Sequence, residues 1–133
     1  MISKILKNYR DRERRTQVRL FIDDLLDGFI VREGVKPIQV YLNDISKGGL
    51  SFLIDKKNSL KVKDKVNLNL YFKNSDKFFQ CEFVVKAVDL EAKDLFRHAI
   101  KVVPNSDNQL ALEFLADFVA SVTISKQNTR NHF

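Results

Sequence analysis

The sequence has one cysteine, two histidines, four glycines and no long hydrophobic run. Its single cysteine, Cys81, cannot form a disulfide within the chain, which favours a reducing, cytoplasmic location. The histidines lie far apart, and a metal site needs three or four ligands, so no metal is expected. The apolar runs are far shorter than the roughly 20 residues that span a membrane. The N-terminus also lacks the apolar core of a secretory signal.

Signs of catalysis are missing as well. The chain has no glycine-rich phosphate loop and no Ser-His-Asp order. It shows no obvious carboxylate pair, because Asp23/Asp24 and Glu91/Asp94 are interpreted as turn residues. We therefore expect a binding protein rather than an enzyme, with no catalytic residues and no cofactor.

Positive charge is concentrated near the N-terminus. The 133-residue chain, long enough for one domain, has a net charge of +6. Such a surplus suits an anionic partner such as a nucleotide, a nucleic acid or an acidic membrane. Lysines are scattered, whereas five arginines fall between residues 10 and 19. Arginine is the residue suited to planar, bidentate recognition of phosphate or a base.

Hydrophobic periodicity predicts a small β-barrel between two helices. Ile2, Ile5, Leu6 and Tyr9 have the spacing of a short helix, followed by a polar arginine arm. Alternation and turn residues predict strands over 18–22, 28–32, 38–43, 50–54, 66–72, 78–88 and 96–103. Short strands with tight turns predict an antiparallel barrel of about six strands.

The period then changes to that of a helix over 111–122, with Ser106–Gln109 in the spacing of a capping box before it. The residues after this helix are polar. The predicted division is therefore 1–13 for the N-terminal helix and arm, 14–124 for the barrel with its C-terminal helix, and 125–133 for a polar tail.

Two short motifs carry the expected chemistry. The first, R-x-x-x-R, fits Arg15 and Arg19, although Arg10/Arg14 has the same spacing. The second, D-x-S-x-x-G, is formed by Asp44, Ser46 and Gly49. Guanidinium groups can bind phosphate or the O6 and N7 acceptors of guanine, while a carboxylate accepts from guanine's donor edge.

In this order, the motifs and the barrel pattern make the chain resemble the PilZ domain, a bacterial receptor for cyclic di-GMP. The resemblance implies a split-barrel fold, cyclic di-GMP as the ligand and an arginine arm that becomes ordered on binding. It implies an unidentified protein partner in motility, pilus assembly, adhesion or exopolysaccharide synthesis. The ligand contacts it implies are Arg14, Arg15, Arg19, Asp44, Ser46, Gly48 and Gly49.

Plainer interpretations remain open at this point. The arginines could form a solvated basic arm, and Asp44 and Ser46 could form an Asx-type turn. Gly48 and Gly49 could supply positive φ in a bend. The chain could be a PilZ-like protein adaptor that binds little or no nucleotide. Binding to a nucleic acid polymer is not expected, because no aromatic residue lies among the arginines.

Overall fold

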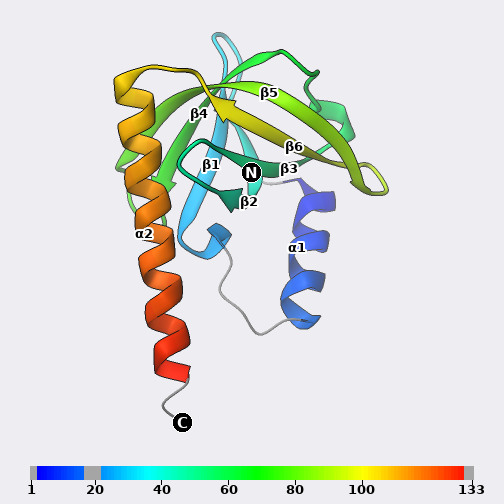
Figure 1. Cartoon of the computed structure of the whole chain (residues 1–133). Helices are drawn as coiled ribbons and strands as arrows, with labels where there is room; N and C mark the ends of the chain where they lie inside the picture. Colours follow the sequence, from blue (N-terminus) through cyan, green and yellow to red (C-terminus); the bar gives the residue numbers. More distant parts are fainter. Residues whose placement is uncertain (1–2, 17–21, 131–133) are drawn as a thin grey trace.

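Six antiparallel strands close into one barrel, in the order β1-β2-β3-β6-β5-β4 (Figure 1). The computed structural model describes residues 3–16 and 22–130. The strands are β1 (Leu26–Val31), β2 (Ile38–Ile45), β3 (Gly49–Asp55), β4 (Lys65–Phe72), β5 (Phe78–Ala92) and β6 (Leu95–Val102). The helices are α1 (Lys4–Thr16) and α2 (Ser106–Arg130), with 3-10 turns η1 (Ile22–Asp24) and η2 (Lys56–Asn58). The predicted barrel with a helix at each end is therefore confirmed.

Alternating side chains fill the barrel. On β4, Val66, Leu68 and Leu70 are buried while Asn67 is exposed. The facing strand β5 contributes Phe83, which lies opposite Val66 and is fully buried. Each such apolar side chain stabilises the fold by about 1.5–3 kcal/mol. Because β1 also pairs with β4, the six strands close into a barrel.

Helix α2 packs on the barrel through one apolar face. Leu112, Leu115 and Val119 belong to the same core cluster as the barrel interior. The helix begins where the Asn105 side-chain oxygen accepts hydrogen bonds from the backbone N–H groups of Asp107 (2.9 Å) and Asn108 (3.3 Å). The predicted capping box from Ser106 is therefore wrong, because the cap lies one residue earlier.

Helix α2 is also longer than predicted. It continues past the barrel, and its backbone is helical to Arg130, so most of the predicted polar tail is part of the helix (Figure 1). Residues 131–133 lie outside the described part. Across the ranges that the structure describes, no helix is long and apolar enough to span a membrane.

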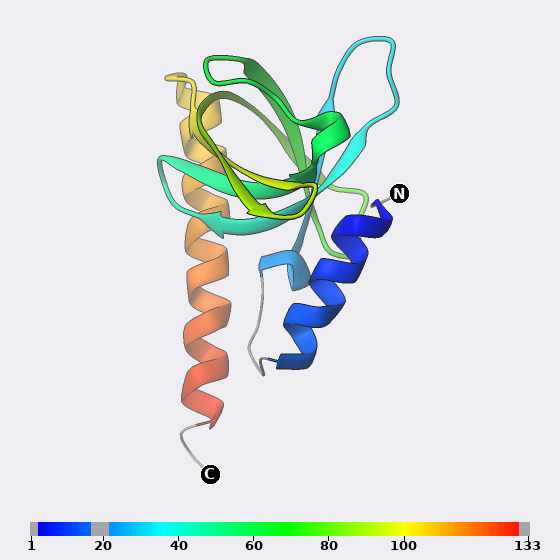
Figure 2. The same ribbon diagram turned by 90° about the vertical axis from the view of Figure 1, so that its right-hand side faces the viewer.

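Helix α1 packs against another side of the barrel from α2 (Figures 1 and 2). Leu6 is buried in a second cluster with Tyr41, Leu53 and Leu95. The helix does not end near Tyr9 but continues through Thr16, so residues 10–16 are helical instead of the polar arm that the sequence predicts. Arginine and glutamate are good helix formers, which explains why charge does not end the helix. Helix α1 crosses the predicted boundary after residue 13, and the division into domains stays a prediction.

The first predicted strand is wrong where the structure describes it. Ile22 begins the 3-10 turn η1, and residues 18–21 of that prediction lie outside the described residues. The other six predicted strands exist, with bounds that differ by up to four residues.

His98 is a buried polar residue within this core. Its ring stacks on Phe52 with 5.2 Å between centroids. Its Nε2 accepts a hydrogen bond from the backbone N–H of Leu60 at 2.8 Å, which only an unprotonated nitrogen can do. Burial lowers the pKa of His98 below its ordinary value of 6.5.

The fold is expected to lose stability as the pH falls below 6.5, because the unfolded chain takes up a proton at His98 that the folded chain resists. This residue contributes a slope of up to about 1.4 kcal/mol per pH unit. Urea unfolding at several pH values measures it. His98→Gln, whose amide oxygen accepts from Leu60 without titrating, is the control and should show a smaller pH dependence. Equal dependence in the two proteins would contradict this role for His98.

Candidate ligand-binding site

The D-x-S-x-x-G motif lies on the hairpin that joins β2 to β3. Asp44 is exposed near the end of β2, where the pairing register shifts between Leu42 and Asp44. Asn43 is therefore part of a β-bulge and not the strand end that the sequence suggests. A bulge changes the direction of the next side chain and is common near binding sites.

The carboxylate of Asp44 is held by side chains. Its Oδ2 accepts hydrogen bonds from Ser51 Oγ at 3.0 Å and from Asn43 Nδ2 at 3.3 Å. Among the described residues it accepts none from the backbone of Ser46, so the Asx turn considered for Asp44 is not formed. Both hydrogen bonds use Oδ2 and hold the carboxylate in place. Oδ1 remains available to accept from a ligand.

Ser46 and Gly49 form the turn itself. The backbone N–H of Ser46 donates to the Gly49 carbonyl at 2.8 Å, and Ser46 Oγ lies 3.2 Å from the same oxygen. The hydroxyl of Ser46 is exposed, so it can exchange this internal partner for a ligand. The structural and ligand-binding interpretations of Ser46 are thus compatible.

The two glycines have different roles, and neither supplies positive φ. A Cβ on Gly49 would lie 2.2 Å from the Ile100 carbonyl oxygen of β6, so only glycine permits this approach of the strands. A Cβ on Gly48 would have no atom within 4 Å. Gly49 is required by packing, whereas the space beside Gly48 is open.

A pocket of about 360 Å³ lies beside this turn. Its volume falls in the range of small-molecule sites. Small residues from two strands, Ser51 of β3 and Ala99 of β6, are among its lining residues. Its lining is Asp44, Ile45, Ser46, Gly49, Leu50, Ser51, Arg97, Ala99 and Ile100.

The structure describes the arginine motif only in part. The backbone of Arg14 and Arg15 forms the last turn of α1, while their side chains and the whole of Arg19 lie outside the described residues. Their contact with the ligand stays a prediction. In the sequence, this segment connects α1 to η1. The turn η1 contacts β2, which is the strand that contains Asp44.

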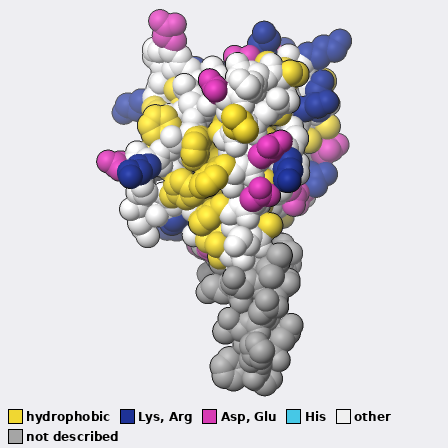
Figure 3. All heavy atoms as spheres, turned by 60° about the vertical axis from the view of Figure 1, so that its left-hand side comes forward, with side chains coloured by type: hydrophobic (Ala, Val, Ile, Leu, Met, Phe, Trp, Pro, Cys, Tyr) yellow, Lys and Arg dark blue, Asp and Glu magenta, His cyan; other side chains and the backbone are white. Residues whose placement is uncertain are grey.

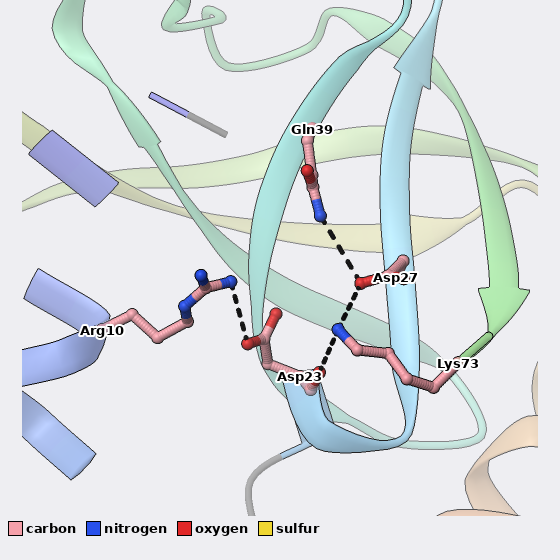
Figure 4. A network of polar contacts seen from close by, with 5 residues as sticks. All are labelled: Arg10, Asp23, Asp27, Gln39 and Lys73. Carbon is pink, nitrogen blue, oxygen red and sulfur yellow. Dashed lines mark hydrogen bonds and ion pairs between the residues drawn. The ribbon is translucent and has the colours of Figure 1, made fainter. Parts of the chain in front are cut away.

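Arg10 is committed to another partner, which bears on the alternative register Arg10/Arg14. Figure 4 shows its guanidinium directed from α1 to Asp23 of η1. The two groups are 3.4 Å apart, with side-chain exposures of 16% and 1%. A ligand would have to break this ion pair to use Arg10, and the choice of Arg15/Arg19 stays a prediction.

Two acidic residues after the arginine motif, Asp23 and Asp27, bind cations within the protein. Lys73 Nζ donates to Asp27 Oδ1 at 2.9 Å and to the backbone oxygen of Asp23 at 3.2 Å (Figure 4). Asp23 is therefore a buried structural residue and more than the turn residue that the sequence suggests. Because Asp23 and Asp27 each bind a cation, this acidic segment repels an anionic ligand less than its sequence implies.

Tyr9 serves to dock α1. Its hydroxyl donates to Glu91 at 2.9 Å, and its ring meets Tyr41 edge to face. Burial and the Glu91 hydrogen bond raise the pKa of Tyr9 to about 12, so the hydroxyl stays protonated. Tyr9 thus packs α1 on the barrel, as its helical spacing indicates.

Arg97 is the residue that the sequence analysis missed. It comes from β6 and lines the pocket that contains Asp44. No local motif marks it, because it approaches β2 only through the pairing of β6 with β3. Its one sequence signal is a charged residue in the predicted strand 96–103.

The structure thus combines a closed barrel with a polar turn beside a small pocket. No cluster of three or more metal-binding side chains occurs within the described ranges. The family model of the PilZ domain matches residues 12–121, and the chain belongs to this family.

One solved structure gives a fold-level comparison. The chain is similar to the Bacillus subtilis inhibitor of motility (MotI/DgrA), with 20% identity and a TM-score of 0.53. The likeness covers 79% of this chain and 53% of that one, so the chain spans about half of that protein's length. At this identity the likeness shows the fold alone. No curated protein matches the chain.

Proposed function

We propose that this chain is a cytoplasmic cyclic di-GMP receptor that transmits ligand binding to a partner protein. The observation that carries the proposal is the pocket beside the β2–β3 turn. In it Asp44 and Ser46, the polar residues of the family's second motif, are both exposed beside open space. PilZ domains are receptor and adaptor domains, so no catalytic step is assigned.

Each motif has a proposed role. Asp44 accepts from the N1–H and the amino group of guanine, and Ser46 adds a hydroxyl contact. Arg15 and Arg19 bind phosphate and the acceptor edge of the base, and Arg14 adds positive charge. Ligand binding would then fix the arginine segment against the barrel, a change that a partner can recognise.

An exposed apolar face could receive that partner. Figure 3 shows hydrophobic side chains gathered on one face of the molecule. Phe78 and Phe114 are 48% and 54% exposed, and Phe114 packs on Phe72 and Phe79. Patches of this kind mark protein interaction sites. Because MotI/DgrA is named an inhibitor of motility, we include motility among the proposed outputs of this chain.

The same face supports a second candidate, an adaptor that binds its partner with little or no nucleotide. The two candidates differ in one measurement, the response to cyclic di-GMP. An adaptor would bind its partner equally with and without this nucleotide.

Isothermal titration with cyclic di-GMP tests the receptor. We expect saturable binding with a Kd near 1 μM, about −8 kcal/mol. Arg15→Ala or Arg19→Ala should each weaken binding by about tenfold or more, because each removes a charge-assisted contact. The matched control is Arg32→Ala, an exposed arginine of the β1–β2 loop. Binding that survives both motif substitutions would refute this site, and no binding would favour the adaptor.

A further inference from the structure

Arg97 and Asp44 occupy the same pocket from strands that are not neighbours. The register places Asp44 opposite Ser51 on β3, and Ser51 opposite Ala99 on β6. Arg97 and Ala99 are two residues apart, so their side chains point to the same outer face of the barrel. Between them His98 points into the core, which agrees with this alternation.

The space between the two charged groups is bordered by small side chains. With neighbouring strands about 4.8 Å apart, the backbones of Asp44 and Ala99 are separated by roughly 10 Å. Ser51 lies between these two residues, and the small side chains of Ser51 and Ala99 fill little of the space above the strands. A planar base can therefore lie over them, with a carboxylate at one side and the long Arg97 side chain at the other.

Within the described residues, Arg97 forms a weak ion pair with Asp89. Arg97 Nη2 lies 3.9 Å from Asp89 Oδ2 on β5, and the two side chains are 43% and 63% exposed. Exposed ion pairs of this length add little stability. A phosphate offers the same guanidinium a bidentate, charge-assisted contact. In the free protein Asp89 thus forms only a weak ion pair with Arg97, which a phosphate can replace.

We propose that Arg97 is a further arginine of the ligand site, which faces Asp44 across the pocket and exchanges Asp89 for a phosphate of the ligand. This inference rests on the proposed function, since it concerns the same site. It also assigns Asp89 a role as a competitor that lowers affinity. If the Arg97–Asp89 pair were purely structural, loss of either residue would have the same effect on affinity.

Opposite effects of two substitutions test the proposal. In titrations with cyclic di-GMP at fixed ionic strength, Arg97→Ala should weaken binding by about tenfold or more. Arg97→Lys should recover part of the loss, because lysine keeps the charge but not the planar group. Asp89→Asn should strengthen binding by about two- to threefold, because it releases Arg97. Arg97→Ala and Asp89→Asn break the same ion pair. If that pair were merely structural, both substitutions would change the affinity in the same direction.

Two controls separate local from general effects. Arg32→Ala removes an exposed arginine elsewhere, and Asp76→Asn removes an exposed carboxylate on the β4–β5 turn. Arg97→Ala must weaken binding by more than Arg32→Ala does, and Asp89→Asn must strengthen binding by more than Asp76→Asn does. Wild-type binding with Arg97→Ala equal to Arg32→Ala would overturn this inference alone. Absence of wild-type binding would overturn the proposed function and this inference together.

Discussion

Asp44→Ala is expected to weaken cyclic di-GMP binding by about 100-fold, while the fold is retained. Hydrogen bonds to a charged group contribute about 1.5–3 kcal/mol each, and each 1.4 kcal/mol is a factor of ten. The substitution leaves the N1–H and the amino group of guanine without their acceptor. Because Asp44 is exposed and its contacts are with Ser51 and Asn43, the effect on stability should be small. Isothermal titration measures the change.

A second ligand makes this test specific. Adenine has neither the N1–H nor the 2-amino group through which guanine would donate to Asp44, so wild-type protein should bind cyclic di-AMP far more weakly than cyclic di-GMP. Asp44→Ala should reduce this preference, whereas Asp76→Ala, which removes an exposed carboxylate elsewhere, should leave it unchanged. A preference for guanine that persists in Asp44→Ala would rule out the proposed role of Asp44.

Gly49→Ala is expected to destabilise the barrel by about 3 kcal/mol. The added Cβ would lie 2.2 Å from the Ile100 carbonyl oxygen, which belongs to the backbone of a neighbouring strand. That strand cannot move without disturbing its pairing with β5. Urea unfolding measures the loss.

The adjacent glycine supplies a matched control. Gly48 has open space where a Cβ would be added, and its φ is not positive. Gly48→Ala should therefore change stability by no more than about 0.5 kcal/mol. Equal losses in the two variants would contradict the different packing of these glycines.

Local patterns were sufficient to predict most of the barrel. The alternation of Val66, Leu68 and Leu70 with polar residues is visible in the sequence, and these residues do fill the interior. The extension of α1 was missed because its last two turns have no apolar periodicity. They are held instead by helix propensity and by Arg10, whose partner Asp23 is distant in sequence.

The site was predictable only where its residues are adjacent in the chain. Asp44, Ser46 and Gly49 form one turn, and a spacing motif can describe one turn. The bulge at Asn43 and the contribution of Arg97 arise from pairing between strands, which no local pattern records. The buried state of Asp23 was hidden because its cation, Arg10, comes from α1 through tertiary packing.

An NMR titration with cyclic di-GMP tests most directly whether the R-x-x-x-R and D-x-S-x-x-G motifs bind the same ligand molecule. We predict that the backbone amide signals of residues 14–19, of the 44–49 turn and of residues around Arg97 shift together. They should reach saturation at the same ligand concentration. Shifts in the turn without any in residues 14–19, or shifts confined to another face of the barrel, would contradict this prediction.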